Sequence, residues 1–346
     1  MKSMGTGGMA LEEKELLAYR AGPLLYVPAN HSGIAEKVRA RAYPCLTSIA
    51  FCLEDAIRDE ALEASEDVLK QTLSALQNVP EAPLLFVRVR SPEHLAHIHR
   101  KLGAENTLLT GYILPKFDAS NGEAYACLVE MLNHGRRQPL YVMPILESKL
   151  LAEIQSRTAA LLAVQEILGS IRQYVLNIRV GGNDFTNLYG LRRSVSQNIY
   201  QIGVVRDILM DILNVFAPDY VVSGPVWEYF GEDPEGAWAV GLQRELALDR
   251  LNGFIGKTAI HPSQLPVIYE SMKVSSTDYE DAVRLTNWES AVSGVAKSAD
   301  GSRMNELKCH ENWARRTVLL GDIYGVKEER AQCGSGSTTG SARHTT

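Results

Sequence analysis

Short apolar runs alternate with longer stretches of helical spacing along most of the chain. The runs occupy residues 24–28, 47–53, 84–89, 111–116, 140–146, 174–182, 219–224 and 253–261. Between them apolar residues recur at helical spacing, as in residues 150–168 and 199–216. Short runs with little alternation are typical of strands buried on both faces, and strands separated by helices pair in parallel through right-handed crossovers. The pattern therefore predicts eight β–α units.

Eight such units in about 250 residues favour an α/β protein with a (β/α)8 TIM barrel over an open doubly wound sheet. The length of 346 residues would also allow two ordinary domains. With the barrel, four segments are expected. They are a flexible N-terminal segment at 1–20, the barrel at 21–273, a C-terminal helical extension at 274–328 and a disordered tail at 329–346.

The charge balance narrows the choice of partners. With 35 Lys and Arg against 41 Asp and Glu, the formal net charge is −6, so the chain lacks the positive field of a nucleic-acid binder. No apolar run approaches the roughly 18 residues of a membrane span, and the N-terminus has no signal-peptide core. A cytoplasmic protein with no nucleic-acid or membrane partner is therefore expected.

Polar residues directly follow the apolar runs, at the strand ends where barrel enzymes carry their active sites. They are Asn30 and His31, Glu54 and Asp55, Arg88 and Arg90, Lys116, Glu147, Asn183 and Asp184, Ser223, and His261. A solvated loop or a helix cap explains any one of them. Carboxylates after three separate runs are better explained by one shared opening, so we expect these side chains to converge there.

Carboxylates from separate strands, without a nearby His or Cys cluster, suit a hard divalent cation such as Mg²⁺. Glu147 and Asp184 are the candidate ligands. The cation would act as a Lewis acid on a bound 2-oxo acid, and the planar guanidinium of Arg88 would bind its carboxylate at two points. Together these groups predict cleavage or formation of a carbon–carbon bond next to a carbonyl.

Two long segments, GPVWEYFGEDPEG (224–236) and GFIGKTAIHPSQ (253–264), carry a family resemblance. Shorter segments agree in order, namely LLYVPAN (24–30), LEDAI (53–57), VRV (87–89), ILPK (113–116), PILES (144–148) and GGNDF (181–185). Over about residues 24–270 the chain resembles the citrate lyase β-subunit family. This family belongs to the wider HpcH/HpaI aldolase group, which includes malyl-CoA and citramalyl-CoA lyases. Departures such as Gly22 in place of an Arg, and Asn183 in place of a Glu, indicate a divergent branch.

The resemblance implies a homo-oligomeric (β/α)8 barrel that holds Mg²⁺ on Glu147 and Asp184. It implies that Arg88 binds the 2-oxo acid part of the substrate. The acidic pair Glu54 and Asp55 would order water on the metal, and Lys116 stands at the fourth strand end.

Five further positions are candidates for substrate contacts. They are Asn30, Gly181, Gly182, Pro225 and His261. The two glycines would bring backbone N–H groups near a carboxylate or phosphate, although tight packing is an equal explanation. His261 is expected to shape the substrate entry rather than to carry a proton.

The residues and the resemblance together predict a Mg²⁺-dependent carbon–carbon lyase. It would cleave a β-hydroxy acid, or its acyl-CoA thioester, to a 2-oxo acid and an acetyl-type product. The base stays open between a water ordered by Glu54 or Asp55 and a carboxylate from a neighbouring subunit's C-terminal segment. Two alternatives remain, a CoA-independent 2-oxo acid aldolase and a barrel that binds a metabolite without turnover.

Overall fold

The computed structural model describes residues 6–288, 293–298 and 300–327. The described residues form two compact units, which are divided between residues 272 and 273. The tail expected at 329–346 lies outside the described residues.

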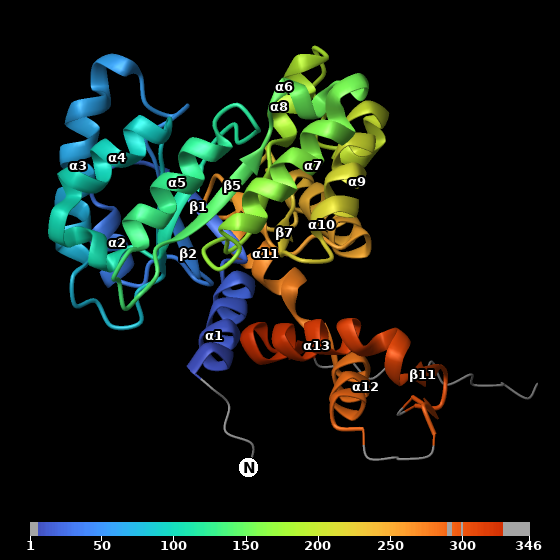
Figure 1. Cartoon of the computed structure of the whole chain (residues 1–346). Coiled ribbons are helices and arrows are strands. Elements are labelled where there is room, and N and C mark those ends of the chain that lie inside the picture. The colour runs from blue at the N-terminus through green and yellow to red at the C-terminus, as the bar shows by residue number, and fades with distance from the viewer. Residues whose placement is uncertain (1–5, 289–292, 299, 328–346) are drawn as a thin grey trace, which may run out of the picture. The chain divides into compact units, whose positions relative to one another are not determined.

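The first unit is a TIM barrel, as predicted (Figure 1). Its parallel strands are β1 (Pro23–Pro28), β2 (Ser48–Cys52), β3 (Leu84–Arg88), β4 (Gly111–Leu114), β5 (Tyr141–Leu146), β6 (Ile178–Val180), β7 (Val222–Ser223) and β8 (Lys257–Ala259). They are ordered β7-β6-β5-β4-β3-β2-β1-β8. The remaining seam between β7 and β8 is bridged by Gly224 and Lys257, and the Gly224 amide donates to the Gly256 carbonyl at 3.0 Å. The strand ends therefore form one ring.

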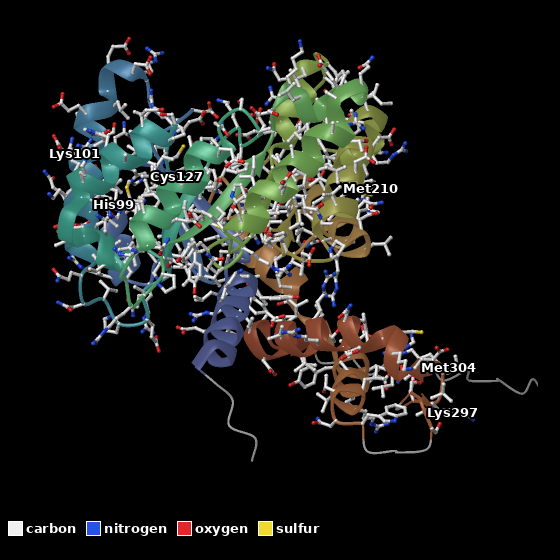
Figure 2. All side chains as sticks on the ribbon, viewed as in Figure 1. His99, Lys101, Cys127, Met210, Lys297 and Met304 are labelled. Atoms are coloured by element: carbon white, nitrogen blue, oxygen red, sulfur yellow. The ribbon has the colours of Figure 1, made fainter. Side chains whose placement is uncertain are left out.

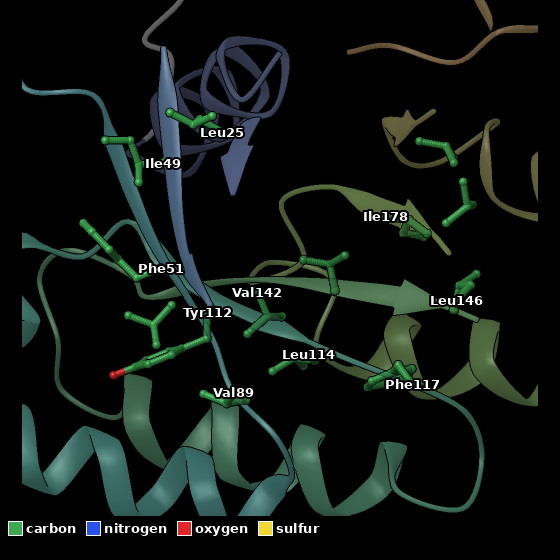
Figure 3. Packing of buried hydrophobic residues seen from close by; sticks show 14 of the residues in the cluster. Leu25, Ile49, Phe51, Val89, Tyr112, Leu114, Phe117, Val142, Leu146 and Ile178 are labelled. Atoms are coloured by element: carbon green, nitrogen blue, oxygen red, sulfur yellow. The ribbon is translucent and has the colours of Figure 1, made fainter. Parts of the chain in front are cut away.

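Alternate residues of each strand belong to two separate apolar layers. The barrel interior contains Leu24, Ala50, Phe86, Ile113 and Met143. The neighbouring positions face the helices, and Figure 3 shows part of this outer layer. β2 and β5 are buried along their whole length, which explains why their sequences show little polar alternation.

Among the described residues, ten helices surround the barrel and α1 lies at one of its ends. They are α1 (Thr6–Arg20), α2 (Ile34–Arg39), α3 (Leu62–Leu76), α4 (Pro92–Leu102), α5 (Gly122–Asn133), α6 (Lys149–Ala152), α7 (Ile154–Ser170), α8 (Gly182–Leu188), α9 (Gly203–Phe216), α10 (Ala237–Asn252) and α11 (Gln264–Met272). Short 3₁₀ turns are η1 (Asp59–Ala61), η2 (Gly103–Leu108) and η3 (Ile199–Gln201). Local signals start some of them: Ser91 caps α4 by accepting from the His94 amide, with Pro92 in the first turn.

In the N-terminal segment, expected to be flexible at 1–20, residues 6–20 form the helix α1, and residues 1–5 lie outside the described residues. The second half of this segment, from Leu11 to Ala18, is made of strong helix formers with no Gly or Pro. Ala18 and Ala21 belong to the same apolar cluster as the barrel interior. The segment therefore closes the end of the barrel where the strands begin, opposite their C-terminal ends.

A buried cluster of charges joins β8 to α10. The fully buried Lys257 lies 2.6 Å from Asp249 Oδ2 and 3.0 Å from Glu245 Oε1. The Tyr200 hydroxyl donates to Asp249 and the Ile199 amide donates to Glu245 at 2.8 Å. Lys257 belongs to a segment that carries the family resemblance, and the structure gives it a role in closing the barrel.

The second unit consists of short strands and two packed helices. Its elements are β9 (Val274–Ser275), α12 (Ser276–Thr286), β10 (Val295–Lys297), β11 (Met304–Glu306), α13 (Leu307–Tyr324) and β12 (Val326–Lys327). β10 and β11 pair antiparallel with Lys297 opposite Met304 (Figure 2). Ala282, Leu285 and Ala314 form its small core. In neither unit does a described helix have the length and apolar character of a membrane span.

Candidate functional site

The predicted charged residues meet at the C-terminal ends of β2 to β6. Arg88, the last residue of β3, is buried, and its Nη2 lies 2.8 Å from Glu54 Oε2 and 3.3 Å from Glu147 Oε1. Asp55 Oδ2 lies 3.2 Å from the same nitrogen. The guanidinium lies over the face of the Tyr26 ring, with Arg88 Cζ 5.9 Å from the ring centroid. Three carboxylates and a ring therefore fix Arg88 in one orientation.

Lys116 belongs to the same cluster through both its backbone and its side chain. Its φ of +49° places it in the left-handed region, which is rare for a residue with a side chain. In this conformation its amide donates to Glu147 Oε1 at 3.0 Å, while its ammonium group contacts Glu54 and Asp55. The strained turn after β4 thus ties the acidic pair to Glu147.

Glu147 and Asp184, the candidate metal ligands, converge beside Gly181. A side-chain carbon at Gly181 would overlap Glu147 and would lie 3.0 Å from Asp184 Oδ2. Burial raises the pKa of Glu147 to about 8, Arg88 opposes this rise, and the nearby Asp184 carboxylate adds to it. Two carboxylates in close proximity are unfavourable alone, and a cation between them removes the repulsion.

The acidic pair after β2 has two different environments. Burial raises the pKa of Glu54, although Arg88 and Lys116 oppose this. Burial alone would also raise the pKa of Asp55, but hydrogen bonding with Glu54 and the charges of Arg88 and Lys116 bring it below its usual value. Neighbouring carboxyls with separated pKa values can take different acid and base roles.

The mouth of the barrel, which is the rim at the C-terminal ends of the strands where these residues meet, carries an excess of negative charge. When all four carboxyls are ionised, Glu54, Asp55, Glu147 and Asp184 exceed the two cations, Arg88 and Lys116, by two negative charges. In the described part of the chain, no group of three or more His, Cys, Asp or Glu side chains is arranged to hold a metal. Two carboxylates are nevertheless enough for Mg²⁺, which keeps several positions for water and substrate.

The other predicted positions lie around this cluster. Gly182 lies against Pro225, because a side-chain carbon there would be 2.6 Å from Pro225 Cβ. His261 Nδ1 accepts from the Ser263 amide at 3.2 Å, and its ring stacks on Phe230. Asn30 is exposed just after β1.

Arg90, which also follows β3, supports the acidic loop. Its side chain donates to the carbonyls of Leu53 at 2.7 Å and Ile57 at 2.5 Å, on either side of the acidic pair. Arg90 therefore stabilises the loop that carries the acidic pair, whereas Arg88 contacts the carboxylates themselves.

Two polar residues below the mouth were not predicted, because the strand-end rule concerns only residues that follow a strand. Tyr26 lies in the middle of β1 and Arg179 in the middle of β6, and both face the barrel interior. An arginine within the run Ile178–Val180 was a visible signal, since a charge inside a buried strand needs a reason.

Fold and site together define a TIM-barrel enzyme with a carboxylate-rich mouth suited to a hard cation. The chain belongs to the family described as C-C bond lyase of the TIM-barrel fold, whose model matches residues 15–326. The predicted class of enzyme, a carbon–carbon lyase related to citrate lyase β-subunits, is thereby confirmed.

Several solved structures are similar. CitE from Mycobacterium tuberculosis, in complex with magnesium, acetoacetate and coenzyme A, has 20% identity and a TM-score of 0.58, with 88% of this chain and 99% of that one covered. A citrate lyase from Burkholderia xenovorans LB400 has 15% identity and a TM-score of 0.63, covering 89% and 94%. RipC from Yersinia pestis has 15% identity and a TM-score of 0.51, covering 75% and 98%. The low identities fit a divergent branch. No protein with a curated description matches the sequence.

Proposed function

We propose that the chain is a Mg²⁺-dependent lyase that cleaves a β-hydroxy acid, or its acyl-CoA thioester, to a 2-oxo acid and an acetyl-type product. The observation that carries this proposal is the convergence of Glu147 and Asp184 beside Gly181, with Arg88 3.3 Å from Glu147. The place of the chain in a family of carbon–carbon lyases supports it.

The residues at the mouth fit a divalent cation. Glu147 and Asp184 would hold it, and a bound cation would favour the ionised form of Glu147, whose pKa burial and Asp184 raise to about 8. The similar CitE structure contains magnesium together with acetoacetate and coenzyme A. When bound, Mg²⁺ would polarise the oxygen of the 2-oxo group and stabilise the negative charge that develops there.

Arg88 binds the carboxylate of the 2-oxo acid half in this proposal. Its guanidinium is held by Glu54, Asp55 and Glu147 before substrate arrives, so little reorganisation accompanies binding. Lysine at this position would keep the charge but lose the planar pair of donors.

The acidic pair supplies the proton acceptor. Cleavage requires loss of the substrate's hydroxyl proton, after which the carbon–carbon bond breaks and the released carbanion equivalent takes up a proton. Glu54 and Asp55 carry carboxyl groups with separated pKa values at the rim, where one can hold a proton while the other stays ionised. Lys116 keeps both in place. The proposal also includes a homo-oligomeric assembly in the cytoplasm.

The direct test is turnover in the presence of Mg²⁺, with malyl-CoA, citramalyl-CoA and free 4-hydroxy-2-oxo acids as substrates. Release of a 2-oxo acid from any of them supports the proposal, and the substrate cleaved separates a thioester lyase from a free-acid aldolase. If Mg²⁺ and pyruvate bind while none of these compounds is cleaved, the chain is a binding barrel and the proposal is wrong.

Arg88→Lys is expected to lower kcat/KM for the cleaved substrate by about 10²–10³, because one preorganised charge contact is lost. The matched control is Arg172→Lys, an exposed arginine that pairs with Asp219 before β7. It is expected to leave turnover unchanged. Equal activity of Arg88→Lys and the parent would show that Arg88 does not bind the substrate.

Gly181→Ala tests the geometry of the carboxylates. Its methyl group would displace Glu147, so we expect Mg²⁺ affinity to fall at least about tenfold by isothermal titration. Gly169→Ala in α7 is the control, since a side-chain carbon there meets no atom within 4 Å. Unchanged Mg²⁺ affinity in Gly181→Ala would contradict the assigned ligand pair.

A further inference from the structure

Arg179 is a buried cation with donors to spare. Its side chain comes from the middle of β6, and the residue is 2% exposed. Nη2 donates to Thr258 Oγ1 at 2.7 Å, while Nε and Nη1 have no hydrogen-bond partner. Among the carboxylates in the described part of the chain, none forms an ion pair with it.

The other strongly buried cations of the barrel are compensated. Lys257 contacts Glu245 and Asp249, and Arg88 contacts Glu54 and Glu147. Arg193 also has Nε and Nη1 without a hydrogen-bond partner, but it lies 3.6 Å from the Glu245 carboxylate, so Arg179 differs from it in having no carboxylate. A buried charge without a partner and with unsatisfied donors is costly, so folded proteins rarely keep one that is unused. The missing partner of Arg179 therefore points to an anion supplied by a ligand.

The position of Arg179 relates it to the mouth. It precedes Gly181 by two residues on the same strand, and its neighbour Ile145 on β5 precedes Glu147 by two residues. Residues two apart on a strand face the same side, about 7 Å apart along it. Arg179 thus lies one layer of side chains below the candidate metal ligands.

Tyr26 connects the two layers. Its ring lies against Arg88, and its hydroxyl adjoins Arg179, where it opposes the lowering of the Arg179 pKa by burial. Tyr26 and Thr258 are both partly exposed although they stand on buried strands. The two residues that contact Arg179 therefore reach solvent, although Nε and Nη1 of Arg179 are themselves buried, while Leu24 and Ala21 are fully buried at the opposite end.

We propose that Arg179 is a second anion-binding group inside the barrel, which binds the far carboxylate of a short 2-oxo dicarboxylate. The 2-oxo acid end of this ligand lies at the mouth with Arg88, so the inference rests on the function proposed above. It deepens that function by naming the 2-oxo acid half of the substrate as a four- or five-carbon dicarboxylate. Arg179 acts as a specificity-determining residue in this arrangement.

The test compares three ligands by isothermal titration in Mg²⁺, namely pyruvate, freshly dissolved oxaloacetate and 2-oxopentanoate. The last has an uncharged ethyl group where oxaloacetate has its second carboxylate. In the parent protein, oxaloacetate is expected to bind about ten- to a hundredfold more tightly than 2-oxopentanoate, as for one charge-assisted contact. In Arg179→Met this preference is expected to fall within about threefold, while pyruvate affinity is kept. Arg172→Met, at an exposed arginine, should keep the full preference.

The outcomes separate the two claims. If the parent does not bind pyruvate in Mg²⁺, the proposed function fails. If pyruvate binds but oxaloacetate has no advantage, or keeps it in Arg179→Met, the inference about Arg179 is wrong. Should Arg179→Met fail to fold, a crystal structure of the parent with Mg²⁺ and oxaloacetate decides. A carboxylate at hydrogen-bond distance from Nε or Nη1 of Arg179 supports the inference, and its placement elsewhere overturns it.

Discussion

Asp184→Asn is expected to lower Mg²⁺ affinity at least about a hundredfold, measured by isothermal titration with pyruvate present, because it removes one of only two charged ligands. Turnover should fall by about 10²–10³ at fixed Mg²⁺. The control is Asp207→Asn, the same exchange at an exposed residue of α9. Undiminished Mg²⁺ binding in Asp184→Asn would mean that the cation, if bound, lies elsewhere.

Glu147→Gln tests the second metal ligand. It also shows whether the loss of Mg²⁺ affinity comes from the site itself or from misfolding. In the absence of metal, burial and Asp184 make the ionised Glu147 unfavourable, which is why its pKa rises to about 8. Its amide analogue removes that cost, and its oxygen can still accept from Lys116 and Arg88. We therefore expect Glu147→Gln to lose Mg²⁺ binding while its thermal midpoint stays the same or rises. A lowered midpoint would contradict this account of the site.

Lys257→Met is expected to destabilise the barrel by about 3–5 kcal/mol, because it leaves the buried Asp249 without a counter-charge and leaves Glu245 with only Arg193, 3.6 Å away. Glu245 and Asp249 are both almost fully buried and both contact the Lys257 ammonium group. The hydrophobic replacement has similar length, so the loss of charge dominates over the loss of volume. Unfolding in urea, followed by circular dichroism, measures the effect.

The matched exchange Lys149→Met separates this effect from a general cost of losing a lysine. Lys149 is exposed, and its ammonium group lies 3.3 Å from the carboxylate of Glu153, four residues further along the chain. Surface pairs of this kind contribute about 0–1 kcal/mol, so little change is expected. Equal destabilisation by the two substitutions would show that the buried cluster does not hold β8 against α10.

Local pattern was sufficient for the strands and for the residues that follow them. Runs such as Tyr141–Leu146 are apolar on both faces, and a parallel strand covered by helices requires that. Because all strands point the same way, whatever follows them reaches one rim, which is how Glu54, Arg88 and Glu147 could be grouped. The same rule does not apply to side chains in the middle of a strand, and for this reason Arg179 was not predicted.

Contacts between distant segments could not be predicted in this way. Lys257 ends up between β8 and α10, because its side chain faces outward and Asp249 lies opposite. That pairing depends on the register in which the last strand closes the ring. Similarly, the left-handed turn at Lys116 follows from contacts to Glu147 and the acidic pair, which lie in other β–α units.

The central claim is that the mouth binds Mg²⁺ and a 2-oxo acid together, and the most direct measurement is titration of the parent protein with Mg²⁺ with and without pyruvate. The structure predicts mutual reinforcement: because Mg²⁺ and Arg88 would hold the same ligand, pyruvate should raise Mg²⁺ affinity, and Mg²⁺ should raise pyruvate affinity by the same factor. Independent binding of the two, or no Mg²⁺ binding at all, would contradict it.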